Sequence, residues 1–392
     1  MNADRLLRDT LREWAEETPP RPGPDLAGRA LLRRRRRRAT SLSVTAAAFA
    51  LLAGAVAVPV LAQSDRPGHS VPGSLIDNTV SAYPRESPPR HLIAAGDVAV
   101  SAYQADYKTQ TRDGVERTTY SWYLYDRGTK RYEKTRWGWV DVAPGMRRAA
   151  VLEKTLPASR VGILDLDTGK VTKWIPLKSG AGGVQWSPDG KRLAVTTYRG
   201  YPDVETSTRS RFTPHARTGY YLVNVASGRK EYRPMGVDTD YDRFGGVGRL
   251  DVRWSRDGTL LVVPAPPSGA TETWYDLDGQ ASEKIPLYEG SDAAPAGLSP
   301  DGRYYTVGDG WTATVKETRT HRTVSGSSGS MALAWADNGR LVRWECRPDG
   351  DCAGGVGERL VLTDPAGRSR VPLTGYRYED GPREWEPLIT RR

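Results

Sequence analysis

Three aspartates alternate in the stretch VDTDYDRFGG and form the most metal-like motif of the chain. They are Asp238, Asp240 and Asp242. Alternating carboxylates are typical of calcium-binding loops, which take oxygen ligands from every second residue. However, Arg243 occupies the position where such loops have glycine, and no glutamate closes the frame near residue 249. We therefore favour a solvated acidic loop over a calcium site and predict no bound metal.

The only two cysteines, Cys346 and Cys352, enclose the segment RPDGD. Two cysteines are too few for a zinc site. A close, even pair in an extracytoplasmic domain favours a disulfide. We predict a Cys346–Cys352 bridge that shapes a short loop.

Signals for catalysis are missing from the sequence. The four histidines show no metal-ligand spacing, and neither a Gly-x-Ser-x-Gly motif nor a glycine-rich phosphate loop occurs. We predict no cofactor and no catalytic residue. The alternative is a cell-surface enzyme, a lactonase- or cyclase-like hydrolase or lyase, because scattered acidic residues in such a site leave no local motif.

Residues 39–62 form an uncharged segment of 24 residues. At 1.5 Å per residue, a helix of that length crosses a hydrocarbon core of about 30 Å. Positive charge directly before such a span predicts a cytoplasmic N-terminus and an exported C-terminal part. A regulatory or nucleic-acid patch is the lesser alternative for this run. The run consists of Arg33, Arg34, Arg35, Arg36, Arg37 and Arg38.

A cleaved signal peptide is the rival interpretation of the same segment. Val60-Leu61-Ala62 resembles a small-residue cleavage site, but the 38 residues before the span are many more than a signal peptide has. We favour an uncleaved signal anchor that binds the lipid bilayer through 39–62. Both interpretations export the same domain, so the predicted location is the cell membrane, single-pass, with the C-terminal part outside.

The N-terminal arm, 1–38, contains a short amphipathic segment at 4–17. Leu7, Leu11 and Trp14 share one face of a helix, and a proline-rich stretch follows. This stripe makes a cytoplasmic regulatory protein or the inner leaflet the candidate partner, with a frayed helix of no role as the alternative. The arm also holds 11 arginines and 6 acids, half of the net charge of +10. The high charge is therefore no basis for a nucleic-acid-binding face.

Composition favours an all-β body over a helical bundle. The chain has 41 Gly and 28 Pro, which favour turns, and 19 Tyr and 12 Trp against 3 Phe, which favours strands with wet edges. Residues 63–90 show little periodicity and are predicted to be an extracytoplasmic stalk.

A turn motif recurs six times in the exported part, at a mean spacing of about 48 residues, which is typical of propeller blades. The first position is apolar in every copy. The copies begin at Ile93, Val142, Trp186, Trp254, Leu298 and Trp335.

Each motif is followed by strand-like residues and then by a second turn, such as ILDLDTGKVTKWIPL at 163–177. Each repeat therefore predicts four strands with two tight turns, because Asp-Gly and similar pairs accept positive φ. One four-stranded sheet cannot bury both faces, whereas six in a ring can. We predict a six-bladed β-propeller over 91–392, after one transmembrane helix and a short cytoplasmic helix. Either 374–392 or 75–83 is expected to close the ring.

The pattern apolar-Ser-Pro-Asp-Gly-x-x-Leu-Ala resembles the repeat of TolB-like, WD-like β-propellers. With its arginine-rich arm and single anchor, the chain resembles membrane-anchored propeller proteins of actinobacteria. The resemblance implies a binding module in which the Asp-Gly residues are structural. Independently of the resemblance, the repeat register predicts that Trp186, Trp254 and Trp335 are core residues at equivalent positions of three blades.

The long insertions all fall on the propeller face opposite the tight turns, and they make this loop-rich face the candidate binding face. They are 104–120, 199–219, 235–249 and 346–358. We expect sensing or scaffolding by binding of an extracytoplasmic protein, glycan or small ligand there; tolerated surface decoration is the alternative. The candidate residues are Tyr107, Arg112, Arg199, Tyr201, Arg211, His215, Asp238, Asp240 and Asp242.

Overall fold

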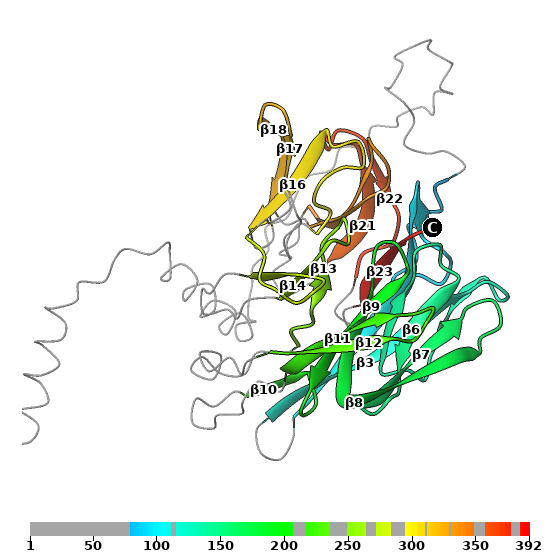
Figure 1. Cartoon of the computed structure of the whole chain (residues 1–392). Coiled ribbons are helices and arrows are strands. Elements are labelled where there is room, and N and C mark those ends of the chain that lie inside the picture. The colour runs from blue at the N-terminus through cyan, green and yellow to red at the C-terminus, as the bar shows by residue number, and fades with distance from the viewer. Residues whose placement is uncertain are drawn as a thin grey trace, which may run out of the picture. The chain divides into compact units, whose positions relative to one another are not determined.

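A computed structural model gives the structure of the chain, which divides into two units, Met1–His69 and Ser70–Arg392. Every residue that the structure describes lies in the second unit (Figure 1). The described residues are 79–110, 115–206, 217–235, 249–263, 272–283, 295–309, 312–328, 331–348, 357–377 and 385–392. The predicted cytoplasmic helix, the arginine run and the predicted anchor lie outside them. Within these ranges, no helix is long and apolar enough to cross a membrane.

The described part is all-β and forms five sheets, in which every strand pair between named strands is antiparallel. The first sheet has six strands: β1 (Ala94–Ala95), β2 (Val98–Gln110), β3 (Val115–Asp126), β4 (Arg131–Lys134), β10 (Val204–Thr206) and β23 (Trp385–Arg391). The second has seven: β5 (Trp139–Val142), β6 (Arg148–Leu152), β7 (Ala158–Asp165), β8 (Val171–Trp186), β9 (Arg192–Tyr198), β11 (Arg217–Asn224) and β12 (Lys230–Pro234).

The C-terminal half contributes three smaller sheets in chain order. The third sheet contains β13 (Arg253–Trp254), β14 (Leu260–Val263) and β15 (Thr273–Asp276). The fourth contains β16 (Tyr304–Asp309), β17 (Thr312–Glu317) and β18 (Thr323–Ser328). The fifth contains β19 (Ala332–Trp335), β20 (Leu341–Cys346), β21 (Glu358–Thr363) and β22 (Arg370–Pro372).

The recurring turn has one local structure in the three Ser-x-Asp-Gly copies. In the first of them, the Ser187 hydroxyl donates to Asp189 at 2.5 Å and accepts the backbone N–H of Arg192 at 2.9 Å. Gly190 has a φ of 67°, a conformation that glycine adopts without steric cost. The same bonds recur at Ser255 and at Ser299. The motif therefore closes its own hairpin.

The first turns of neighbouring repeats contact one another from the second repeat to the sixth, and the sixth contacts the first. The hydrogen bonds are Arg148 to Gly190 O, Arg256 to Ala296 O, Trp335 Nε1 to Gly297 O and Asp97 N–H to Ala336 O. The second repeat meets the first sheet through the C-terminal strand instead, because Gly145 N–H donates to Arg391 O in β23. Between the third and fourth repeats, Pro188 packs against Gly258.

Trp186, Trp254 and Trp335 are buried, with 5%, 8% and 4% of their surface exposed. Each indole N–H donates to the carbonyl of the residue just before the motif of the preceding repeat. The pairs are Trp186 with Asp141 at 3.2 Å, Trp254 with Gln185 at 3.2 Å and Trp335 with Gly297 at 3.0 Å. These three equivalent contacts join neighbouring repeats edge to edge.

Two features differ from the expected separate four-stranded sheets. The second and third repeats share one continuous strand, β8, whose first half pairs with β7 and whose second half pairs with β9. In addition, much of 104–120 is not a loop: it lengthens β2 and β3, which pair from Ala102 to Gln110. The expectation of a loop there was wrong, because the alternating Tyr and Thr residues continue the strand pattern.

The C-terminal segment supplies the extra strand of the first sheet. β23 pairs with β2 on the side away from β3, from Val98 to Ala105. Of the N-terminal candidate 75–83, the structure describes 79–83, and these residues form only isolated bridges, Ser81 with Ala94 and Tyr83 with Thr374. Of the two candidate closing segments, 374–392 therefore provides the strand.

Candidate functional site

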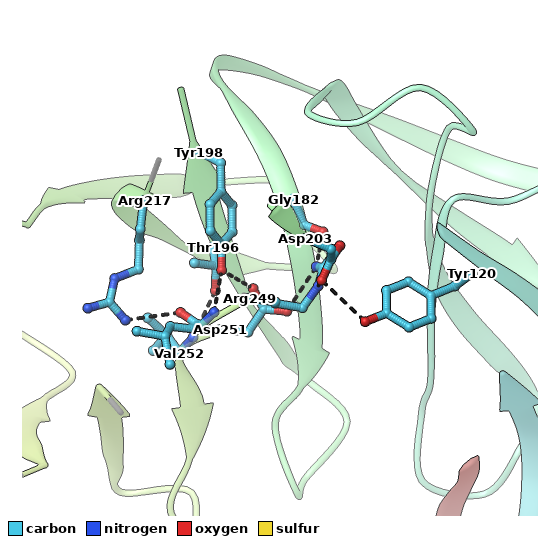
Figure 2. A network of polar contacts seen from close by, with 10 residues as sticks. Tyr120, Gly182, Thr196, Tyr198, Asp203, Arg217, Arg249, Asp251 and Val252 are labelled. Carbon is cyan, nitrogen blue, oxygen red and sulfur yellow. Dashed lines mark hydrogen bonds and ion pairs between the residues drawn. The ribbon is translucent and has the colours of Figure 1, made fainter. Parts of the chain in front are cut away.

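A buried arginine, Arg249, joins three sheets at the ends of their strands opposite the tight turns (Figure 2). Its Nε and Nη2 donate to the two carboxylate oxygens of Asp203 at 3.0 and 2.7 Å. Its Nη1 donates to Asp251 at 3.1 Å and also to the carbonyl oxygen of Gly182. The guanidinium lies 3.6 Å from the ring centre of Trp139. All these groups belong to different segments, so the arginine fixes their relative positions.

The sequence brings these groups together through the ends of its strands and insertions. Asp203 lies in the insertion that leaves β9 and leads into β10, and Arg249 and Asp251 lie just before β13. Gly182 lies within β8, and Trp139 begins β5. The network therefore joins the bases of the two insertions at 199–219 and 235–249.

Tyrosines complete the network on both sides of the arginine. The Tyr198 hydroxyl donates to Asp251 at 2.7 Å and accepts the backbone N–H of Leu250 at 3.1 Å. On the other side, the Tyr120 hydroxyl donates to Asp203 at 3.3 Å (Figure 2). Tyr120 is part of β3, so the network also reaches the lengthened hairpin of the first sheet.

Charge compensation explains why these groups are buried. Burial lowers the pKa of Arg249, but the charges of Asp251 and Asp203 more than offset this and raise it. Burial, with a contribution from the Asp251 charge, raises the pKa of Tyr198 well above its usual value. The arginine is therefore permanently charged and the tyrosine neutral, which is the arrangement that a buried network needs.

The network is closed rather than reactive. Side-chain exposure is 9% for Arg249 and 3% for Asp203, and the arginine donates to two carboxylates and one carbonyl. Gly183 leaves the space that the Asp251 carboxylate fills, because a side chain there would collide with it. The chemistry of the cluster is therefore positional: it holds two insertions and one hairpin in fixed geometry.

Three of the nine candidate binding residues lie in the described part. Tyr107, on β2, is 42% exposed, and Arg199 is also exposed. Tyr201 is partly buried: its hydroxyl donates to Thr118 O at 3.0 Å, and Arg117 lies 4.4 Å over its ring. The insertion at 199–206 thus packs beside β3, with which β10 pairs. The remaining six, Arg112, Arg211, His215, Asp238, Asp240 and Asp242, lie outside the described residues.

The predicted disulfide and the calcium alternative stay untested. Cys346 ends β20, whereas Cys352 lies outside the described residues, so the bridge remains a prediction. Within the described ranges, no group of three or more His, Cys, Asp or Glu side chains could hold a metal ion.

Sequence reasoning missed Asp203, Arg249 and Asp251. The only signal in the sequence is the position of Arg249 and Asp251, a few residues before the Trp254 motif. They are two residues apart, so a strand would place both side chains on one face. Their partner Asp203 is 46 residues away, beyond any local periodicity. Asp203 and Arg249 meet only in the folded chain, where β13 and the residues before it lie beside β8.

Comparisons with known proteins assign no family to this chain. No protein-family model matches the chain, and no curated protein matches it. Among solved structures, TolB from Acinetobacter baumannii is similar to 76% of this chain over 67% of its own, with 18% identity and a TM-score of 0.40. That likeness is too weak to assign a fold or a function.

Proposed function

We propose that this chain is a membrane-anchored extracytoplasmic binding module, built as a six-bladed β-propeller. Residues 39–62 form its anchor, with the arm 1–38 in the cytoplasm. The Arg249 network is the observation that supports a binding role. It fixes the bases of the insertions 199–219 and 235–249 and the lengthened hairpin of β2 and β3 relative to one another.

The contacts between repeats support the propeller. First turns join successively from the second repeat to the sixth and then to the first, and the second repeat meets the first sheet through β23, as a closed ring would require. Hydrophobic clusters fill the spaces between neighbouring repeats, for example Val142 and Val151 with Ala102 and Leu124. The C-terminal strand β23 completes the first sheet, in the manner of ring closure by a terminal strand.

Rigidity at the base supports binding by the insertions. A loop binds with smaller entropy loss when its ends are already fixed. Here the fixed part presents two exposed side chains, Tyr107 on the lengthened hairpin and Arg199 at the base of the insertion 199–219. We take the partner to be a protein, because exposed Tyr and Arg side chains are enriched in protein–protein interfaces.

Site-specific photocrosslinking in the native envelope tests the binding role. A photoreactive amino acid replaces Tyr107 or Arg199 and, as controls on exposed tight turns, Thr168 or Lys230. We expect a protein adduct of one common mass from the first two positions and no protein adduct from the controls. Protein adducts at all four positions, or at none, would overturn the proposed binding face.

Reporter fusions test the topology. A reporter before Met1 and one after Arg392 should be active on opposite sides of the membrane. Recovery of a soluble form that starts near Gln63 would show a cleaved signal peptide instead.

The sequence left a cell-surface hydrolase or lyase as the alternative. No observation on the described residues favours it.

A further inference from the structure

In the proposed propeller, the tight turns of the six repeats form a face of their own, opposite the insertions. First and second turns lie side by side: Leu166 N–H donates to Arg147 O, and Val225 N–H to Lys191 O. Arg127 reaches from one repeat to Asp167 of the next at 3.2 Å. We call this the turn face. It consists of 96–97, 126–131, 143–148, 165–170, 187–192, 224–230, 255–259, 276–280, 299–303, 317–322, 336–340 and 364–370.

The turn face is basic, unlike the rest of the exported part. Residues 63–392 contain 46 lysines and arginines against 41 acids, an excess of five. The turn face alone contains 17 against 12, which is the same excess of five. The remaining surface and core are therefore neutral as a whole, and the entire positive excess lies on this one face.

The acids and bases of the turn face differ in how they are held. Asp189 accepts hydrogen bonds from Ser187 and from the Lys191 N–H, and these bonds keep its pKa below the usual value although burial opposes them. Asp257 and Asp301 behave alike. The side chains of Lys191 and Arg229 are each 78% exposed, although Lys191 lies 3.8 Å from Asp189 and Arg229 pairs with Glu231 at 2.7 Å. Ion pairs this exposed contribute little, so both cations stay accessible to an anionic surface.

The chain also enters the described part at this face. Thr79 is the first described residue, and its carbonyl accepts a hydrogen bond from Arg392 at 2.6 Å. Its hydroxyl accepts one from Arg340, which is part of the turn face, at 3.3 Å. Only 16 residues, 63–78, separate this point from the predicted anchor, and a chain of that length spans at most about 55 Å.

We propose that the turn face docks on the anionic lipid headgroups of the membrane that holds the anchor, so that the insertions point away from it. This inference rests on the proposed anchor. Basic residues near an anionic bilayer are attracted to it, and the attraction decays within a Debye length. The short connection to Thr79 keeps the basic face within reach of the surface.

Energy transfer in vesicles tests the docking. The full chain, with both native cysteines changed to serine, carries Thr168→Cys on the turn face or Tyr107→Cys on β2. It is reconstituted in phosphatidylcholine or in equal parts phosphatidylcholine and phosphatidylglycerol, with acceptor dye on a trace of lipid headgroups. A membrane-impermeant donor dye then labels only molecules whose introduced thiol faces outward.

We expect transfer from the dye on the Thr168→Cys variant to rise in the phosphatidylglycerol vesicles. It should return to the phosphatidylcholine level near 1 M salt, where the Debye length is about 3 Å. Transfer from the dye on the Tyr107→Cys variant should stay low in both lipids. Equal transfer from the turn-face dye in both lipids, or a rise at both positions, would overturn the proposal.

Charge variants provide the matched comparison. Lys170→Gln, Lys191→Gln and Lys230→Gln remove three exposed charges from the turn face, and Arg136→Gln, Lys154→Gln and Lys178→Gln remove three exposed charges from the other side. Each turn-face charge should contribute about fivefold to the docked-to-undocked ratio at low salt. The control set should leave that ratio unchanged, and an equal loss in both sets would contradict a specific face.

Two further results separate this inference from the proposed function. Failure of the chain to float with any vesicle would remove the anchor and with it both proposals. Flotation without lipid-dependent transfer would leave the anchor and overturn the docking. If a labelled polyglutamate peptide binds in a manner that needs Lys170, Lys191 and Lys230 while transfer ignores lipid charge, the face serves an acidic protein instead.

Discussion

Two side chains each accept a hydrogen bond from the backbone of the next repeat. Asp141 accepts the backbone N–H of Trp186 at 2.6 Å, and Gln185 accepts that of Trp254 at 2.9 Å. An amide and a carboxyl thus do the same task in successive repeats. They differ in charge, so the contact of Asp141 depends on pH whereas that of Gln185 does not.

Asp141→Asn should make the fold more stable at alkaline pH. Burial raises the pKa of Asp141 to about 7, although hydrogen bonds from Trp186 and Val142 oppose the rise. Because the pKa is about 3.9 in the unfolded chain, the contribution of this group is greatest below about pH 4 and is lost as pH rises through about 7. The residue is partly exposed, so water reduces the size of the effect.

Thermal unfolding of the parent and of Asp141→Asn measures this directly. At pH 8 the variant should melt at a higher temperature, because it keeps an acceptor for Trp186 and has no charge. At pH 4 the two curves should coincide. Gln185→Glu, which introduces a carboxyl at the equivalent position, should show the opposite change at pH 8.

Arg249→Met should destabilise the fold by about 3–5 kcal/mol, because it leaves the buried Asp203 carboxylate without its charge partner. Arg249→Met combined with Asp203→Asn should recover part of that loss. Arg229→Met, at an exposed ion pair with Glu231, should stay within about 0.5 kcal/mol. Denaturant unfolding of the full chain gives all three values, and equal effects of Arg249→Met and Arg229→Met would show that the network is not structural.

Among the strands, the C-terminal one is held by aromatic packing as well as by its ladder. Trp385 is 1% exposed, with its ring 5.2 Å from that of Trp344 and 5.7 Å from that of Tyr103. Arg377, itself buried, donates to Trp385 O at 3.0 Å and pairs with Glu358. The strand thus connects the first sheet with the fifth.

Trp385→Ala should cost about 3–5 kcal/mol, the usual effect of removing a buried Trp side chain. Val307→Ala, a large-to-small change at a residue that is 39% exposed, is the control and should change stability little. Thermal unfolding compares the two. A small effect of Trp385→Ala would mean that β23 is dispensable for the fold.

Replacing Cys346 and Cys352 with serine should leave the fold intact. A bridge across so short a loop contributes about 2–3 kcal/mol through chain entropy, which is modest for a body of this size. We expect a small drop in melting temperature and a larger loss of partner crosslinking at Tyr107. Collapse of the fold would show that the loop is needed for the packing of the fifth sheet.

Across the molecule, neighbouring repeats contact one another, the first and second through the C-terminal strand β23. The proposed closed ring would have no free end at which unfolding can begin, unlike an open array of repeats. The stability of each sheet should therefore depend on contacts at distant junctions.

Trp254→Ala tests this dependence by weakening one junction. Hydrogen exchange should become faster not only in β13 and β14 but also in β20 and β21 of the fifth sheet, because opening is global in a cooperative unit. Faster exchange confined to β13 and β14 would show that the repeats open independently. Leu222→Val, a milder change in a partly buried side chain, should leave exchange in the fifth sheet unchanged.

The all-β class and the position of each tight turn could be predicted from the sequence. Both depend on local chemistry: Asp-Gly pairs accept positive φ, and alternating apolar residues form strands whatever lies around them. The burial of Trp254 and its equivalents followed from the same periodicity. The predicted anchor and cytoplasmic arm remain sequence-based predictions.

Which distant segments meet could be learned only from the folded chain. The choice of β23 as the added strand depends on how well Trp385 fits between Trp344 and Tyr103, and no pattern within 385–391 encodes that fit. The pairing of Asp203 with Arg249 likewise depends on two insertions that approach each other across β8. Local propensity acts over a few residues, whereas burial and charge pairing act between whichever segments the completed fold brings into contact.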